Sequence, residues 1–212
     1  KAGKPRYSFV MESIVDKETE AAGVLSAVFE RWFEGRGWSP RPHQLALARA
    51  GLAQKSALLI APTGGGKTLA GFLASLIELE ARPPVRPGAA GQALHTLYIS
   101  PLKALAVDVK RNLEIPIAEM GLPVTLETRT GDTSQSKRLR QRHAPPDILM
   151  TTPEQLALLL SYPDATRLFG GLKCVILDEL HAMVNTKRGD LLALDLARLS
   201  GLSPRHRRIG LS

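Results

Sequence analysis

The stretch Leu58-Leu59-Ile60-Ala61-Pro62-Thr63-Gly64-Gly65-Gly66-Lys67-Thr68 decides the fold of this chain. An apolar run leads into a glycine-rich turn, and Lys-Thr then opens an apolar helix. Three consecutive glycines let successive backbone N–H groups turn toward one anion without Cβ clashes. The stretch therefore predicts a phosphate-binding loop between a strand and a helix, with the partly positive helix N-terminus directed at the phosphates.

The residues that close this loop predict a nucleoside triphosphate with Mg²⁺ as the ligand. Lys67 would add a mobile positive charge near the β- and γ-phosphates, and the Thr68 hydroxyl could ligate Mg²⁺. The strict pattern G-x-x-x-x-G-K-[ST] fails at its first position, where Ala61 stands. A glycine-rich turn with a chance Lys-Thr pair is the alternative, but the strand and helix patterns on either side favour the phosphate loop. The cradle itself would comprise Thr63, Gly64, Gly65 and Gly66.

Composition sets broad limits on the class of protein. The 212 residues suffice for one hydrophobic core, and the 44% hydrophobic content is ordinary for a globular domain. No apolar run approaches the roughly 18 residues of a membrane span, and no secretory signal pattern is visible. We therefore expect no membrane partner and a cytoplasmic, nucleoid-associated location. The one cysteine, Cys174, lies in an apolar run, which predicts a buried thiol.

The charge balance favours a polyanionic partner. The formal net charge is +8, and basic residues gather in two runs, at 137–143 and 205–208. Each run could contact nucleic acid or simply face solvent. The second run directly precedes a predicted terminal strand, so it could also be a basic loop.

Strands alternating with helices predict an α/β fold, with a mostly parallel sheet covered by helices on both faces. We expect strands at residues 56–60, 96–100, 124–129, 148–151, 174–177 and 208–212. We expect helices at residues 20–34, 43–53, 67–79, 102–113, 153–160 and 190–199, and a polar, basic helix or turn at 133–142. Residues 82–92, rich in Pro and Gly, predict an exposed loop.

A second acidic motif completes the expected nucleotide site. Asp178-Glu179-Leu180-His181 follows the apolar run 174–177 and would lie at the carboxyl edge of the sheet, where open α/β folds bind ligands. Asp178 is placed to hold Mg²⁺ through water, and Glu179 to polarise the attacking water. A helix cap is the alternative for the two carboxylates. His181 either couples this site to nucleic acid or caps a turn.

Together these segments resemble the first RecA-like P-loop NTPase domain of superfamily 2 DExH-box helicases. Residues 61–68 are similar to motif I in the A-x-x-G-x-G-K-T variant of helicase-type ATPases, and residues 178–181 to motif II. Shorter segments follow in the family order: 100–105 (motif Ia), 129–132 (the Gly-Asp segment), 151–154 (motif Ib) and 211–212 (the start of motif III). Several of them most resemble the large-helicase-related (Lhr) group, and residues 32–44 resemble its ligase-associated DExH subgroup.

The resemblance implies roles for further residues. Gln44 would read the adenine edge of ATP, since its amide both donates and accepts; a polar residue at a helix N-terminus is the alternative. Trp38 or Phe33 would stack on adenine or pack in the core. Nucleic-acid phosphates would be held at Pro101, Lys103, Gly131, Thr152 and Pro153, the two prolines as helix-start residues. Contacts of this kind predict little sequence preference and a steep salt dependence.

The resemblance also implies an activity. It is that of a bacterial, DNA-repair-associated ATPase that translocates on single-stranded DNA, with an RNA-dependent DExH ATPase as the alternative. Residues 19–212 would be the helicase ATP-binding domain, cut within motif III, and residues 1–18 an extension that could include vector-derived residues. The expected partners are the second RecA-like domain of the same protein and a DNA ligase or nuclease encoded nearby. Because that second domain supplies an arginine finger, we expect this chain alone to bind ATP weakly and hydrolyse it poorly.

Two other classes fit less well. An AAA+ or ABC ATPase would not carry the segments at 100–105 and 151–154 at this spacing. A catalytically inactive nucleotide-binding scaffold would need damage at Lys67, Asp178 or Glu179, and all three residues are intact.

Overall fold

The computed structural model describes residues 8–9, 23–62, 64–83 and 93–212. Within them, seven strands form one sheet in the order β1-β2-β7-β6-β3-β5-β4, and each neighbouring pair is parallel. The strands are β1 (Ser8–Phe9), β2 (Ala57–Leu59), β3 (Thr96–Ile99), β4 (Leu126–Arg129), β5 (Ile148–Thr151), β6 (Cys174–Leu177) and β7 (Arg207–Leu211). The predicted α/β class is confirmed, and the sheet in these residues is wholly parallel.

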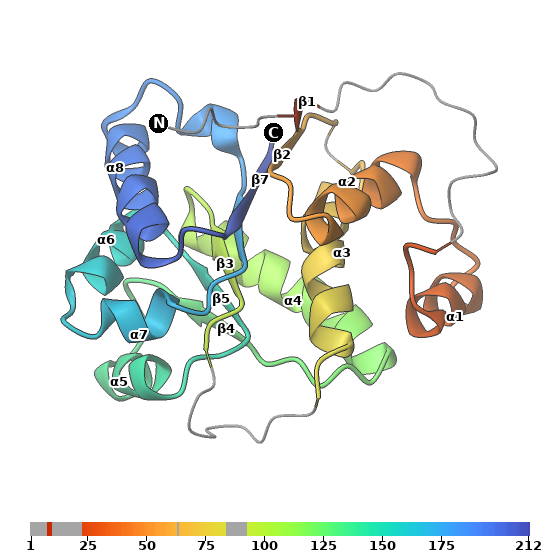
Figure 1. The fold of residues 1–212 in the computed structure, drawn as a ribbon, viewed down its shortest axis with the longest axis horizontal. Coiled ribbons are helices and arrows are strands. Elements are labelled where there is room, and N and C mark those ends of the chain that lie inside the picture. Colours follow the sequence, from red (N-terminus) through yellow and green to blue (C-terminus); the bar gives the residue numbers. More distant parts are fainter. Residues whose placement is uncertain (1–7, 10–22, 63, 84–92) are drawn as a thin grey trace.

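Helices cover both faces of this sheet (Figure 1). They are α1 (Ala27–Gly35), α2 (Pro42–Leu52), α3 (Lys67–Glu80), α4 (Lys103–Glu119), α5 (Gln135–His143), α6 (Pro153–Ser161), α7 (Ala165–Phe169) and α8 (Lys187–Leu202), with a short 3₁₀ helix η1 (Leu180–Ala182). One core cluster joins α1, α2, α3 and α4 to the sheet, and a second joins α6, α7 and α8 to its other face.

The alternation of side chains along β3 shows how one strand supplies both cores. Tyr98 belongs to the cluster under α3, whereas Leu97 and Ile99 belong to the cluster under α8. All four residues of β3, β5 and β6 are buried, as expected for central strands covered on both sides. Cys174, in β6, is buried as predicted, and burial raises the pKa of its thiol.

Several boundaries differ from the sequence-based expectations. Helix α4 continues to Glu119, six residues past the expected end, and contains Pro116. Its last turns are retained because Leu113 and Ile117 are buried in the core. Helix α7 was not expected. It is a single short turn, and its residues Leu168 and Phe169 are buried. Helix α1 begins at residue 27, and residues 20–22 of the expected helix and 84–92 of the expected loop lie outside the described residues.

The basic run at 205–208 is largely structural. Arg207 is fully buried, and its guanidinium donates to both carboxylate oxygens of Glu78 at 2.8 and 2.6 Å. Arg208 donates to the carbonyl of Leu196 at 2.9 Å and to Ser200 Oγ at 2.5 Å on α8. These contacts attach β7 to α3 and α8, so the interpretation of this run as a basic loop is wrong for Arg207 and Arg208.

Candidate functional site

The glycine-rich loop has the backbone shape that an anion cradle requires. Gly64 and Gly66 have φ angles of +78° and +74°, a left-handed conformation that strains any other residue. Gly66 is also the N-cap of α3, so the loop leads directly into the helix N-terminus. Lys67 Nζ donates to the Ala61 carbonyl at 2.7 Å, which bridges the loop from its end to its start. Thr63, the remaining cradle residue of the prediction, lies outside the described residues.

The N-terminus of α2 is attached to this loop. Gln44 Oε1 accepts from the Arg41 N–H at 2.9 Å, and Gln44 Nε2 donates to the Gly66 carbonyl at 3.3 Å. His43 Nε2 lies 2.9 Å from the Gly65 carbonyl oxygen. Gln44 is therefore next to the glycine-rich loop, and it is also a polar residue in the first turn of its helix; its predicted contact with adenine stays a prediction.

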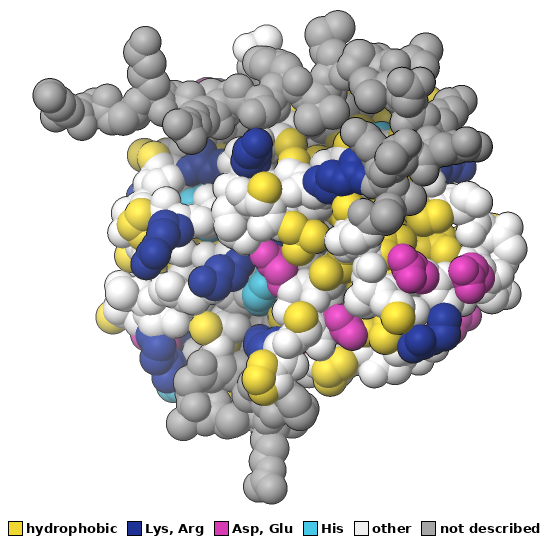
Figure 2. All heavy atoms as spheres, turned by 45° about the vertical axis from the view of Figure 1, so that its right-hand side comes forward, with side chains coloured by type: hydrophobic (Ala, Val, Ile, Leu, Met, Phe, Trp, Pro, Cys, Tyr) yellow, Lys and Arg dark blue, Asp and Glu magenta, His cyan; other side chains and the backbone are white. Residues whose placement is uncertain are grey.

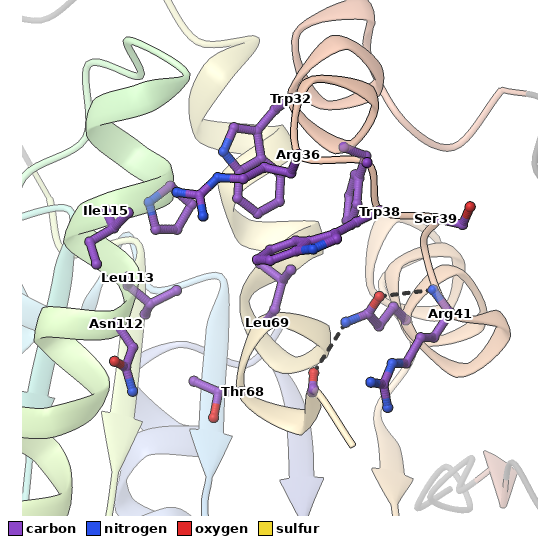
Figure 3. Close-up of a pocket in the computed structure, with 15 residues that line it drawn as sticks. Trp32, Arg36, Trp38, Ser39, Arg41, Thr68, Leu69, Asn112, Leu113 and Ile115 are labelled. Carbon is purple, nitrogen blue, oxygen red and sulfur yellow. Dashed lines mark hydrogen bonds between the residues drawn. The ribbon is translucent and has the colours of Figure 1, made fainter. Parts of the chain in front are cut away.

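A cavity of about 630 Å³ opens beside Gln44 and the first turn of α3 (Figure 3). Its wall includes Thr68 and the indole of Trp38, which is 52% exposed. Phe33 also lines this cavity, but it is only 3% exposed and belongs to the buried core. Of the two aromatic candidates, Trp38 is therefore the one whose ring is available to a planar base.

Contacts between α1 and α4 hold the Trp38 side of this cavity. Arg36 lies over the Trp38 ring, 5.2 Å from its centre, and both Arg36 and Trp32 donate to Glu119 at the end of α4. Figure 3 shows Arg36 and Trp32 near Trp38 on the same side of the cavity, and the two indole rings meet edge to face with centres 5.8 Å apart. The sequence analysis missed this group because its partners lie more than 80 residues apart.

The acidic motif directly follows β6, as predicted. Asp178 is 5% exposed; its Oδ2 accepts from the hydroxyl of Tyr98 at 2.5 Å, and its Oδ1 accepts from the Glu179 N–H at 2.8 Å. Glu179 adopts a left-handed conformation, with φ of +47°. A helix cap is not the role of these carboxylates in the structure, since neither accepts from the first turn of η1.

A chain of polar contacts connects the acidic motif to the phosphate loop. Glu179 Oε2 lies 3.2 Å from His181 Nε2, and His181 Nδ1 lies 2.9 Å from Ser212 Oγ. The Ser212 carbonyl accepts from the Ala61 N–H at 3.1 Å. Segments predicted as motifs I, II and III therefore meet at one place, the carboxyl ends of β2, β7 and β6.

Side chains of the kind that Mg²⁺ prefers are present at this place. Asp178, directly after β6, supplies carboxylate oxygens, and Thr68, in the first turn of α3, supplies a hydroxyl. The described part of the chain contains no group of three or more His, Cys, Asp or Glu residues that could hold a metal ion by itself. That donor set fits Mg²⁺, which is usually held by one or two carboxylates together with water and substrate phosphates.

The predicted nucleic-acid residues follow β3, β5 and β4, the next three strands of the sheet. Lys103 Nζ lies 2.7 Å from Asp132 Oδ2, so the segments after β3 and β4 touch. Lys103 and Gly131 are exposed, whereas Pro101, Thr152 and Pro153 are buried. Pro153 begins α6 as predicted. The same expectation is wrong for Pro101, because α4 has Leu102 as its N-cap and begins at Lys103.

The basic run at 137–143 is engaged mostly in contacts within the protein. Arg138 donates to three backbone carbonyls in the loop 130–133, at 2.7 to 3.1 Å. Two ion pairs of 2.8 and 2.7 Å are Arg140–Glu127 and Arg142–Asp164. On the face shown in Figure 2, Lys and Arg side chains are dispersed among apolar ones and do not form one patch. Neither basic run is therefore a free cationic surface as a whole.

Comparison with known proteins identifies a family model and several relatives that match most of this chain. The family model for DEAD/DEAH box helicases matches residues 41–212. The "Lhr helicase/ probable uracil glycosylase" of Mycolicibacterium smegmatis is 43% identical over 201 residues, which cover 90% of this chain and 13% of that protein. The "ATP-dependent helicase Lhr-Core" of Methanocaldococcus jannaschii is 37% identical over 220 residues, covering 98% of this chain and 25% of that protein. The chain thus spans a quarter or less of these relatives.

Solved structures of similar proteins have the same fold as this chain. The Mycobacterium smegmatis helicase Lhr bound to single-stranded DNA and AMP-PNP has a TM-score of 0.80 and 41% identity, over 90% of this chain and 25% of that chain. The DUF1998 helicase MrfA bound to DNA and AMPPNP has a TM-score of 0.75 and 26% identity, over 90% of this chain and 26% of that chain. The resemblance to the Lhr group and to a first RecA-like domain is confirmed, and the ligase-associated subgroup stays a prediction. No helix in the described residues is long and apolar enough to cross a membrane.

Proposed function

The chain belongs to the DEAD/DEAH box helicase family, and from this premise we propose that it is the ATP-binding motor domain of an enzyme that hydrolyses ATP as it translocates on single-stranded DNA. The proposed context is DNA repair, inside the cell and associated with the nucleoid. Support comes from the similarity to Lhr helicases and from the nucleotide analogue and DNA named in the related structures.

The observation that carries this proposal is the contact chain from Glu179 through His181 and Ser212 to Ala61. It supports the proposal because these contacts connect Glu179, the proposed water-orienting carboxylate, with the loop proposed to hold the phosphates. A nucleotide-binding scaffold would not require Glu179 to be tied to the phosphate loop in this way. His181, exposed at the same edge, is the proposed coupling residue.

Each residue then has a proposed task. The glycine loop and Lys67 would bind the β- and γ-phosphates of ATP, and Gln44 with Trp38 would bind adenine. For Gln44 to do so, its amide must leave at least one of its present contacts with Arg41 and Gly66. Asp178 and Thr68 would hold Mg²⁺, which when bound neutralises charge on the phosphates. Glu179 would accept a hydrogen bond from the attacking water and orient it.

The second half of the sheet edge would bind DNA. Backbone N–H groups after β3, β4 and β5 are suited to phosphates, and Lys103 is an exposed cation in the segment after β3. Because such contacts do not read bases, binding should have little sequence preference and should weaken steeply with salt. The second RecA-like domain is the proposed partner for catalysis. A DNA ligase or nuclease partner rests on the resemblance alone.

The test is ATP hydrolysis by the longer protein that carries both RecA-like domains, with single-stranded DNA, single-stranded RNA or neither, at two salt concentrations. Salt-sensitive stimulation by DNA alone is expected. Stimulation by RNA that equals or exceeds that by DNA would contradict the DNA assignment and favour an RNA-dependent ATPase.

For the 212-residue chain alone we expect little hydrolysis, and DNA-stimulated turnover near roughly 10 s⁻¹ would contradict that expectation.

Two substitutions separate binding from hydrolysis in the same assay. Lys67→Ala should abolish nucleotide binding, and unchanged affinity would refute the phosphate-loop assignment. Glu179→Gln should keep nucleotide binding and stop hydrolysis, and continued turnover would remove Glu179 from the reaction.

A further inference from the structure

We propose that the buried hydroxyl of Tyr98 is a positioning group that holds the Asp178 carboxylate in the orientation needed to bind Mg²⁺. This inference rests on the proposed function, because it assigns a second residue to the same nucleotide site. Tyr98 lies in the middle of β3, which the sequence analysis treated only as an apolar strand.

The contact itself is short and shielded from water. Tyr98 is 0% exposed and Asp178 is 5% exposed, and 2.5 Å separate the phenol Oη from Asp178 Oδ2. An O–H group that donates to a carboxylate at this distance makes a charge-assisted hydrogen bond, which is stronger than a bond between neutral groups. A carboxylate shielded in this way depends on its donors for orientation, since little water is available to replace them.

Strand register explains why these two residues meet. Tyr98 pairs with Ile176 across the β3–β6 ladder, and Asp178 comes two residues after Ile176. Alternation along β6 directs Asp178 to the same face of the sheet as Ile176, the face on which Tyr98 lies. On that face Phe72, from the helix after the phosphate loop, stacks on the Tyr98 ring with centres 5.4 Å apart. The ring is thus held between α3 and the sheet with its hydroxyl on Asp178.

The other oxygen of the same carboxylate is held as well. The Glu179 N–H donates to Asp178 Oδ1 at 2.8 Å, so two donors fix the plane of the carboxylate. An ionised carboxylate has about four acceptor sites, so each oxygen keeps capacity for the metal or its water.

A role in packing alone makes a different prediction from a role in positioning. Phenylalanine would keep the ring and its stacking on Phe72 while removing only the donor to Asp178. If the ring alone matters, Tyr98→Phe should leave the magnesium dependence of nucleotide binding unchanged. If the hydroxyl positions Asp178, the variant should bind nucleotide normally without the metal and should need more Mg²⁺ than the unsubstituted protein to reach the same tightening.

The experiment measures ADP affinity at increasing Mg²⁺ concentrations and in EDTA, for the unsubstituted protein and for Tyr98→Phe. Affinity in EDTA should agree within about twofold, since the phosphate loop is intact. The Mg²⁺ concentration for half-maximal tightening should rise roughly tenfold, the lower end of the loss seen when residues that orient metal ligands are removed. In an Asp178→Asn background the same substitution should add no further change. Tyr162→Phe, which removes a phenol hydroxyl elsewhere in the chain, is the matched control and should not alter the Mg²⁺ requirement.

The outcomes are distinct. If the unsubstituted protein binds no ADP with Mg²⁺, the proposed function fails and this inference fails with it. If it binds ADP and Tyr98→Phe has the same Mg²⁺ requirement, only this inference is overturned. Should Tyr98→Phe not fold, 3-fluorotyrosine at position 98 provides a second readout by ¹⁹F NMR. Its resonance should shift when Mg²⁺ is added to the ADP complex, and a resonance that does not move would overturn the proposal.

Discussion

Replacing Glu78 by Gln would leave the Arg207 guanidinium buried without a negative partner. Glu78, on α3, accepts from Arg207 at 2.8 and 2.6 Å and from Gln54 Nε2 at 2.8 Å. It also lies 3.4 Å from His95 Nε2. Arg207 is 0% exposed, so water cannot take over the lost carboxylate. Glutamine keeps the shape of the side chain and removes its charge, which isolates the ionic contribution.

The magnitude follows from the pKa of Glu78. Burial raises that pKa, but hydrogen bonds from His95 and Arg207 lower it more, so that it falls from 4.5 to about 2. At about 1.4 kcal/mol per pKa unit, this fall from 4.5 to about 2 corresponds to about 3–4 kcal/mol of stability at neutral pH. Breaking a buried pair by removing one partner typically costs about 3–5 kcal/mol, which agrees. A domain of this size has only about 5–15 kcal/mol in total.

The same pKa also determines how the stabilising contribution of Glu78 changes with pH. The pKa of Glu78 is lower in the folded protein than in the unfolded chain, so its contribution is complete above about pH 4.5. It is lost as the pH falls from there through about 2. Glu78→Gln should therefore destabilise the protein at pH 7 and should lose less stability than the unsubstituted protein when both are taken to pH 3.

Urea unfolding at pH 7 and pH 3 measures both effects. Glu80→Gln, the same substitution two residues further along α3, is the control and should change the unfolding free energy by less than about 0.5 kcal/mol. Adding Arg207→Met to Glu78→Gln should recover part of the loss, because no unpaired charge remains. A decrease in unfolding free energy below about 1 kcal/mol for Glu78→Gln at pH 7 would refute the reasoning, because it would mean that Arg207 does not depend on the Glu78 charge.

Three further predictions concern the nucleotide and DNA edges. Gly66→Ala puts a Cβ 2.7 Å from Gln44 Nε2 at a φ of +74°, so urea unfolding should show a loss of at least about 1 kcal/mol; unchanged stability would contradict the loop geometry. Trp38→Ala should weaken ADP binding roughly 5- to 100-fold through lost base stacking, and equal affinity by fluorescence titration would place the base elsewhere. Asp132→Asn should release Lys103 and tighten binding of single-stranded DNA about twofold or more at low salt, measured by anisotropy; weaker binding would mean that Asp132 itself supports the DNA edge.

The strongest local patterns in the sequence predicted the central fold well. β5 and β6 have the predicted bounds, because four consecutive apolar or β-branched residues between turn signals are typical of a strand buried on both faces. Helix α3 begins at Lys67 as expected, since three glycines cannot continue a helix backward. The placement of Asp178 at a strand end followed from the same patterns.

Long-range pairing could not be predicted in this way. Arg207 and Glu78 are 129 residues apart, and nothing near either one marks the other as its partner. The two basic runs were therefore open to a nucleic-acid interpretation that most of their side chains do not support. Helix α4 was predicted too short because Pro116 normally ends a helix, whereas burial of Leu113 and Ile117 compensates for the hydrogen bond that it removes.

The order of the strands shows why Tyr98 matters more than its position in the sequence suggests. The nucleotide segments follow β2, β7 and β6, the proposed DNA segments follow β3, β5 and β4, and the two groups meet only where β6 lies beside β3. At that boundary the Asp178 N–H donates to the Ile99 carbonyl at 2.9 Å, and the Tyr98 hydroxyl binds the Asp178 carboxylate. Because close-packed strands have low compressibility, a displacement at the end of β3 cannot be absorbed between them. It must either move Asp178 together with β3 or break its contact with Tyr98, and each alternative alters the orientation of the carboxylate proposed to hold Mg²⁺.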